Sequence, residues 1–442
     1  MKKGIVILSL IVSILYSAPR VVLGEMFTNT SCGPCRNDNL QMDAFTVQKW
    51  DILSFIRYHV WWPSASDPFY QANQAQNRTR TNFYHINAVP AIVMEGTEQM
   101  RAGEVFSYVD PRSQVPSSVY FELYSKYESY GVHSADSSGE GTALFHIVTD
   151  TTVLEEDQIG GMLHLVVIED SINFNAPNGL TLHNQVMRHM FPGATGIFTT
   201  IDYGDEYVEE RDFYIDTSWV ETMCQLVGFY QSTTDKEVYN SAHFYIIPKE
   251  GTYDFSIQDL TVVSSANWQI VEPGDTLYVY ATVKNNEDAL EDVELIVMTD
   301  PEYEYIVRSV DAGEIKKGES YTNGDDPLIV YIPEDEEVND ITITVYAADK
   351  GSHLYVSETG NSRDNLGVKV NNNSVVKVDV VNKVLSITGY SGKLVIYDAL
   401  GREVRRVRIR KKGMVDLSEE VSGIYFIKMI DAQDVVKKII LF

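Results

Sequence analysis

Cysteine, basic residues and long apolar runs are all scarce in this 442-residue chain, and each scarcity excludes a class of protein. The 3 cysteines are too few for a secreted scaffold held together by disulfides. Lys and Arg number 35 against 63 Asp and Glu, and the net charge of −28 repels nucleic-acid backbones, so we expect no nucleic-acid partner. Beyond the N-terminus no apolar run approaches the roughly 20 residues of a membrane-spanning helix.

The apolar content of 44% and charged content of 22% are those of a folded protein, and the length predicts two to four domains. The charge is uneven along the chain. Residues 374–442 hold 13 Lys and Arg against 8 Asp and Glu, a net charge of +5, which leaves −33 on residues 1–373. A change of this size predicts a module boundary near residue 374.

The N-terminus has the pattern of a secretory signal peptide. Lys2 and Lys3 precede an apolar stretch from Ile5 to Leu15, and the small residues Ser17 and Ala18 follow. We expect a signal peptide over residues 1–18 and no transmembrane segment in the mature chain. The alternative, a membrane anchor, is disfavoured by the shortness of the stretch.

The next hundred residues alternate between strand-like and helix-like patterns. We expect strands over 20–28, 52–60 and 88–94, with helices over 35–50 and 70–83. This alternation is typical of an α/β domain, and we place it at residues 19–112.

From residue 113 onward short β-rich segments predominate. We expect a β-rich domain over 113–249 with one helical insert near 180–190, and a β-sandwich over 250–370 with strands such as Leu277–Val283. Acidic Glu334 to Glu337 form a solvated loop in our interpretation, and a calcium site is the alternative. Residues 371–374 are an Asn-rich linker.

Cys32 and Cys35 form a Cys-Gly-Pro-Cys motif between a predicted strand and a predicted helix. A bridge across so short a loop removes little chain entropy, so a redox-active pair is favoured over a structural one. The helix start stabilises a thiolate at the first cysteine, and the thiolate is the attacking species. Pro34 suits the first helical turn, where no amide hydrogen is needed.

The segment Phe27 to Cys35, together with Ala88-Val89-Pro90, resembles the thioredoxin superfamily. The resemblance implies that Cys32 is the nucleophile, that Cys35 is the resolving thiol, and that a cis Val89–Pro90 bond lies beside them. Ser31 stands where an aromatic residue often precedes the first cysteine. Met26 occupies the position of the superfamily's buried acid, and Glu25 should point to the opposite face of its strand.

A narrower resemblance, over about 20–250, is to exported thioredoxin-like proteins of the twenty-eight-kilodalton outer-membrane-protein family. The segments that carry it are Tyr58-His59, Trp62-Pro63, Asp67-Pro68-Phe69-Tyr70, Tyr84, Val89-Pro90, Glu95-Gly96, Glu169-Asp170, Leu182 to Arg188, Phe191-Pro192-Gly193 and Gly196. The resemblance implies an architecture more than an activity.

Several other residues invite a functional interpretation, but a structural one is favoured for most. We expect His59 and His85 to be core or loop residues rather than general bases. For Trp61 and Trp62 a substrate groove and a core edge remain equal alternatives. His183 and His189 lack the further ligands of a zinc site, and Cys224 is predicted to be a buried strand cysteine rather than a third redox partner.

The chain end contains short β segments separated by glycine turns. Leu394–Val404, Val415–Ser418, Ser422–Ile427 and Lys437–Phe442 resemble the type IX secretion C-terminal sorting domain, which we place at 374–442. The resemblance implies periplasmic transit, outer-membrane translocation and removal by a sortase. Seven basic residues between Arg402 and Lys412 are either a solubilising edge or a contact with the translocon or lipopolysaccharide.

The fold class we expect is multidomain: an α/β thioredoxin-like domain followed by all-β, Ig-like sandwich domains. The favoured function is thiol–disulfide exchange with protein thiols and disulfides at the cell surface or in the periplasm. Cys32, Cys35 and Pro90 form its predicted site, with no cofactor and no metal. The alternative is a surface binding or structural protein that uses a thioredoxin-like scaffold without catalysis.

Overall fold

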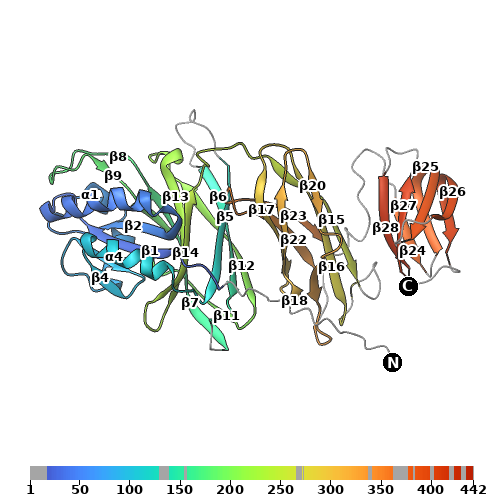
Figure 1. Cartoon of the computed structure of the whole chain (residues 1–442), viewed down its shortest axis with the longest axis horizontal. Helices are drawn as coiled ribbons and strands as arrows, with labels where there is room; N and C mark the ends of the chain where they lie inside the picture. Colours follow the sequence, from blue (N-terminus) through green and yellow to red (C-terminus); the bar gives the residue numbers. More distant parts are fainter. Residues whose placement is uncertain are drawn as a thin grey trace, which may run out of the picture. The chain divides into compact units, whose positions relative to one another are not determined.

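The computed structural model describes residues 17–128, 139–153, 157–264, 271, 273–336, 341–361, 377–381, 384–398, 403–417, 423–429 and 435–441 (Figure 1). The chain divides into two compact units, residues 1–252 with 349–355, and residues 253–348 with 356–442. Most of the signal peptide predicted over 1–18, the acidic residue Glu337 and the 371–374 linker lie outside the described residues. Within these residues the protein is β-rich, with several sheets and few helices.

The first unit begins with mixed helices and strands, shown in blue in Figure 1. The predicted strands and helices before residue 95 are confirmed, although Asn73 divides the second helix. The elements are β1 (Val22–Thr28), α1 (Gly33–Gln48), η1 (Trp50–Ile52), β2 (Leu53–His59), α2 (Pro68–Ala72), α3 (Gln74–Phe83), β3 (Ala91–Met94), β4 (Glu98–Met100) and α4 (Ala102–Ser113).

The rest of this unit is built from strands. They are β5 (Val119–Glu128), β6 (Gly139–Thr149), β7 (Gln158–Glu169), β8 (Ile172–Asn173), β9 (Leu182–His183), β10 (Val186–Phe191), β11 (Ile197–Asp202), β12 (Glu206–Ile215), β13 (Cys224–Ser232) and β14 (Val238–Tyr245), with the short helix η2 (Glu221–Met223). The predicted helical insert near 180–190 is wrong, because that stretch forms β9 and β10. Strand pairing of β10 with β7 on one side and β2 on the other outweighs its local apolar spacing.

One sheet runs through the whole unit, in the order β14-β13-β7-β10-β2-β1-β3-β4, with β11 also paired to β7. β10 makes the connection, since Val186 pairs with Arg57 of β2 and with Glu169 of β7. The predicted boundary at residue 112 therefore falls between elements that share a sheet.

The two faces of this sheet bury different cores. On one face of β1, Val22 and Met26 pack with Met42 of α1 and Val105 of α4. Because side chains alternate along a strand, Leu23 and Phe27 face the opposite core, which includes Val166 and Phe229 from β7 and β13. A third core lies between β7 and β13 and the second sheet, β12-β6-β5.

Nine further strands follow between β14 and residue 361 in the described part of the chain. They are β15 (Phe255–Ser264), β16 (Thr276–Asn285), β17 (Leu290–Asp300), β18 (Glu304–Val307), β19 (Ser309–Ile315), β20 (Ser320–Thr322), β21 (Leu328–Tyr331), β22 (Thr342–Asp349) and β23 (Leu354–Asn361). β16 pairs with β15, β20 and β21, and β17 lies between β22 and β19. The strand predicted at Leu277–Val283 is confirmed, since it lies within β16.

A further sheet ends the chain. It comprises β24 (Lys377–Val381), β25 (Val384–Asp398), β26 (Glu403–Asp416), β27 (Gly423–Met429) and β28 (Val435–Leu441). The described part of the basic stretch falls in β26, which pairs along its length with β25. None of the helices within the described ranges is long and apolar enough to span a membrane.

Candidate functional site

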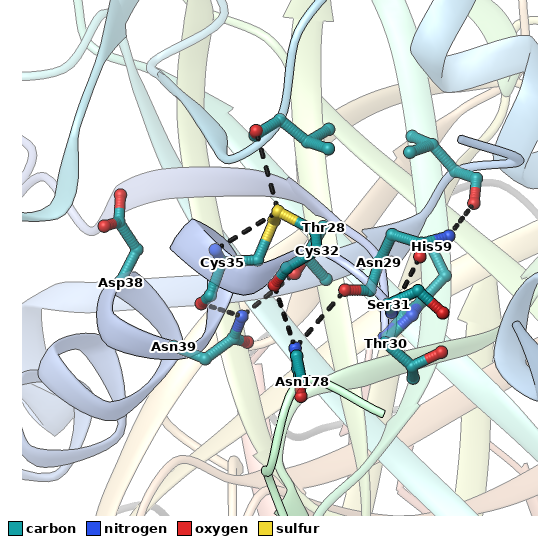
Figure 2. Close-up of a disulfide and its surroundings, with 12 residues drawn as sticks. Thr28, Asn29, Thr30, Ser31, Cys32, Cys35, Asp38, Asn39, His59 and Asn178 are labelled. Carbon is teal, nitrogen blue, oxygen red and sulfur yellow. Dashed lines mark hydrogen bonds between the residues drawn. A yellow bond between two sulfur atoms is a disulfide. The ribbon is translucent and has the colours of Figure 1, made fainter. Parts of the chain in front are cut away.

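Cys32 and Cys35 are joined by a disulfide at the beginning of α1 (Figure 2). Cys32 caps the helix: its Sγ atom accepts a hydrogen bond from the backbone N–H of Cys35 at 3.2 Å. This helix begins with Gly33 and Pro34, as the sequence predicts. The exposed fraction is 5% for Cys32 and zero for Cys35, so an approaching thiol reaches Cys32 first.

The loop before β3 lies against the disulfide. The Val89–Pro90 peptide bond is cis, as the resemblance implies. The Val89 carbonyl oxygen lies 3.7 Å from the Sγ atom of Cys32. Pro90 itself is buried. All three predicted site residues are therefore brought together, although they come from opposite ends of the α/β segment.

Backbone hydrogen bonds hold the short loop that presents Cys32. The N–H of Cys32 donates to the carbonyl of Asn29 at 3.0 Å, and the N–H of Ser31 donates to the Asn29 side chain at 2.8 Å. The Asn29 amide in turn donates to the carbonyls of Val60 and Ser64. Asn29 thus ties the loop to the end of β2, a role that the sequence prediction missed.

Asp67 supports the same loop from the start of α2. Its Oδ2 atom accepts hydrogen bonds from the Thr30 N–H at 2.7 Å and from His59 at 2.8 Å. Burial opposes the charge on Asp67, but His59 and the backbone donors outweigh it and lower the pKa of this carboxyl. His59 is buried in β2 and bonded to Asp67, whereas His85 is an exposed turn residue, as expected from the sequence for core or loop histidines.

A loop from much later in the chain covers one side of the site. The backbone N–H of Asn178 donates to the Thr30 carbonyl at 2.9 Å, and its side-chain amide donates to the carbonyls of Cys32 at 3.2 Å and Asn29 at 3.4 Å. Figure 2 shows Asn178 beneath the loop. Next to it Gly179 has φ of +88°, a left-handed backbone that suits glycine. No local signal in the sequence points to Asn178, because it lies 146 residues from Cys32.

Met26 and Glu25 lie on opposite faces of β1, as the sequence predicts. Met26 is fully buried on the face that α1 covers, and Glu25 points to the other face, where it forms an ion pair with Arg80 at 2.7 Å. Tyr84 also donates a hydrogen bond to Glu25. Glu25 is therefore held away from Cys35 and cannot serve as its proton acceptor.

A buried arginine occupies the face that lacks the acid. Arg57 pairs in register with Met26 across β1 and β2 and donates a hydrogen bond to Asn39 at 3.1 Å. Asn39 donates to the Cys35 carbonyl at 2.8 Å and to Thr28 at 2.9 Å. An ion pair between Arg57 and Asp43, at 2.7 Å, balances the buried charge.

The other candidate residues have structural roles. Trp61 and Trp62 pack in part against the core, and the Arg78 guanidinium lies over the Trp61 ring, which favours the core-edge interpretation. His183 contacts the Phe174 carbonyl, and burial is the main cause that lowers its pKa to about 4. His189 contacts Gln76 and Tyr214. The described residues contain no cluster of three or more metal-ligating side chains.

Cys224 is a free, fully buried cysteine at the start of β13, as predicted. Burial is the main cause that raises the pKa of its thiol, and the nearby carboxylate of Glu169 adds to the effect. Such a thiol is a poor nucleophile.

Residues 362–441 match the family described as the secretion system C-terminal sorting domain. The chain is therefore exported, and this domain directs it to the cell surface or to secretion. The match begins 12 residues before the predicted start at 374. No curated protein matches the chain.

Three solved structures show distant similarity. HBP35 of Porphyromonas gingivalis is 11% identical, with 96% of this chain and 99% of that chain covered and a TM-score of 0.43. A protein of Agrobacterium tumefaciens is 12% identical over 53% of this chain and 98% of its own, with a TM-score of 0.35. The sporulation control protein Spo0M of Bacillus subtilis is 12% identical over 43% and 89%, with a TM-score of 0.16. These likenesses are too weak to assign an activity.

Proposed function

We propose that this exported protein is a thiol–disulfide oxidoreductase with a thioredoxin-like N-terminal domain, acting on protein thiols or disulfides outside the cytoplasm. The observation that carries the proposal is the Cys32–Cys35 disulfide at the start of α1, beside the Val89 carbonyl. The unequal exposure of the two sulfurs supports different roles for them. The resemblance to the twenty-eight-kilodalton outer-membrane-protein family agrees with this proposal but does not identify a substrate.

The exchange proceeds through one mixed disulfide. In the oxidised protein a substrate thiolate attacks Cys32, a bond forms between the two sulfurs, and Cys35 leaves as a thiolate. A second substrate thiolate then attacks the substrate sulfur of the mixed disulfide and releases Cys32. Two electrons pass from the substrate dithiol to the pair, and the substrate leaves as a disulfide. In the reverse direction the Cys32 thiolate attacks a substrate disulfide and Cys35 resolves the intermediate.

The helix start and the missing carboxylate affect the two sulfurs differently. The Cys35 N–H and the helix dipole stabilise a thiolate on Cys32, which favours attack. Met26 stands where a carboxylate would accept the Cys35 proton, so that proton passes to water. We therefore expect resolution to be slower than attack near neutral pH and to accelerate at alkaline pH.

Trapping experiments test the proposal. In a preparation of the full exported chain, Cys35→Ala should accumulate covalent partners on Cys32, because the resolving thiol is gone. Cys32→Ala should accumulate none, because Cys35 is fully buried. The readout is a set of reductant-sensitive bands on non-reducing gels, and an insulin-reduction assay measures turnover of the unmodified protein.

Two outcomes would contradict this assignment. Trapping by Cys32→Ala alone would reverse the roles of the cysteines. Absence of trapping in both variants, with two ordinary thiols in a maleimide titration, would support the alternative of a non-catalytic binding scaffold.

The remaining domains serve delivery in this proposal. Residues 250–370 act as an Ig-like spacer that presents the redox domain away from the membrane. The sorting domain is handled by the type IX translocon and then removed by a sortase, with the basic residues of β26 as the contact to an acidic surface.

A further inference from the structure

Ala18 is buried in the first unit and its backbone forms hydrogen bonds with two distant residues. It is 1% exposed, and its carbonyl accepts a hydrogen bond from the Ser117 N–H at 3.0 Å. Its own nitrogen donates to the Oδ2 atom of Asp150 at 2.5 Å, across 132 residues of sequence. The neighbouring Ser17 is half-buried, and the side chain of Pro19 is exposed although its carbonyl accepts a hydrogen bond from Asn240 at 2.9 Å.

Asp150 is a buried carboxylate without a cation. It is 3% exposed, and its Oδ1 atom accepts hydrogen bonds from the N–H and hydroxyl of Thr152. Among the residues that the structure describes, Asp150 forms no ion pair with a Lys, Arg or His. A buried carboxylate needs a compensating charge, and a neutral backbone amide supplies only part of it. The nitrogen of Ala18 contacts the Oδ2 atom of Asp150, so a positive charge on this nitrogen would compensate the carboxylate.

Removal of the signal peptide between Ser17 and Ala18 would place a positive charge on the Ala18 nitrogen. Hydrolysis of the Ser17–Ala18 bond consumes one water, leaves a carboxylate on Ser17 and leaves an amine on Ala18. The α-amino group has an ordinary pKa of about 7.7–8.0, so it is mostly protonated at neutral pH. Cleavage after Ala18, the boundary expected from the sequence, would instead remove the partner of Asp150 and start the chain at Pro19.

We propose that export processing cleaves between Ser17 and Ala18, and that the new α-ammonium group of Ala18 pairs with the buried carboxylate of Asp150. The ion pair joins the mature N-terminus to the end of β6. The first unit then reaches its full stability only after the signal peptide has been removed, which links folding to arrival outside the cytoplasm. This inference is independent of the redox function proposed above.

The cleavage site is tested on protein isolated from the native host after export. N-terminal sequencing and intact mass should identify Ala18 as the first residue. A chain beginning at Ser17, at Pro19 or further on would overturn the proposed site.

The ion pair is tested with a double-mutant cycle. Two forms of the full mature chain are prepared, one beginning at Ala18 and one with Tyr16 and Ser17 retained, each with Asp150 or with Asp150→Asn. In the form that begins at Ala18 the substitution should lower the folding equilibrium constant at least tenfold more than in the extended form, or about 1.4 kcal/mol. Urea titrations followed by tryptophan fluorescence report mainly on the first unit, which holds Trp50, Trp61, Trp62 and Trp219.

A matched control uses an exposed carboxylate of the same unit, Asp157→Asn, which should have the same small effect in both forms. Equal losses on Asp150→Asn in the two forms would show that Asp150 serves only as a hydrogen-bond acceptor and would overturn the pairing.

Discussion

Asn178 is the residue through which the later part of the first unit reaches the cysteine pair. Its side chain donates to the Cys32 carbonyl at 3.2 Å, and its backbone N–H donates to Thr30. Asn178 is uncharged and holds the Cys32 backbone in place, whereas a carboxylate at this position would add a negative charge that opposes a thiolate on Cys32. Asn178 is thus a positioning residue for the proposed exchange.

Replacing Asn178 should change the reactivity of Cys32 in a way that depends on charge. Asn178→Asp should raise the apparent pKa of the Cys32 thiol by roughly one unit, since a carboxylate beside the Cys32 backbone would disfavour the charged thiolate. Asn178→Ala should raise it less. The pH dependence of iodoacetamide alkylation of the reduced protein measures this pKa. Asn184→Asp, on the same hairpin but bonded to Ser171, is the control and should cause no shift; equal effects of both aspartates would contradict the assignment.

His183 makes the hairpin that carries Asn178 sensitive to acid. Burial lowers its pKa to about 4, below the ordinary value of about 6.5. The unfolded chain therefore binds more protons between these values, so stability is fully present above pH 6.5 and declines as the pH falls towards 4.

His183→Gln should flatten this part of the stability profile, because the glutamine does not titrate. Urea titrations of the first unit between pH 4 and 7 measure the effect. His85→Gln, in an exposed turn, should retain the slope of the unmodified protein. A slope in His183→Gln equal to that of the unmodified protein would assign the sensitivity to other groups.

At the scale of elements, β10 decides how much of the chain must fold together. It fills the place between β2 and β7, and Met187 and Met190 pack in the core that includes Leu23 and Ile56. Without it, β2 would be an exposed edge and the core would lose its contacts with β7 and β13.

We therefore expect a fragment of residues 19–112 to unfold without a cooperative transition, whereas residues 18–252 should unfold sharply. Circular dichroism during urea titration distinguishes the two, and binding of a hydrophobic dye should be strong for the shorter fragment. A cooperative transition in residues 19–112 would support the predicted domain boundary instead.

At the scale of the whole molecule, the C-terminal sorting domain directs the chain to the cell surface or to secretion. The sorting domain has a net charge of +5 over residues 374–442, while the rest of the chain carries −33. The sorting signal lies in the basic C-terminal segment, so export beyond the periplasm should depend on residues 374–442 and not on the acidic domains before them.

Deleting residues 374–442 should retain the protein in the periplasm of its own host. Cell fractionation with a marker for each compartment measures this. The full-length Cys32→Ala variant is the control and should reach the surface normally, since the cysteines have no part in sorting. Normal surface delivery of the truncated chain would contradict the role of the domain.

The sequence by itself determined the features that depend on short stretches of chain. The motif at Cys32 and Cys35, the helix after it and the buried Cys224 follow from local spacing and apolar patterning. The sorting domain likewise follows from motifs within one contiguous segment. Alternation along β1 was enough to place Met26 and Glu25 on opposite faces.

Only the tertiary structure decided the features that join distant segments. The β10 strand was predicted as a helix because its partners β2 and β7 are not neighbours in sequence. Asn178 over Cys32, Arg80 beside Glu25 and Ala18 against Asp150 are contacts across 55 to 146 residues. Local propensity carries no information about such pairs, because their energy comes from burial and charge compensation that exist only once the chain has folded.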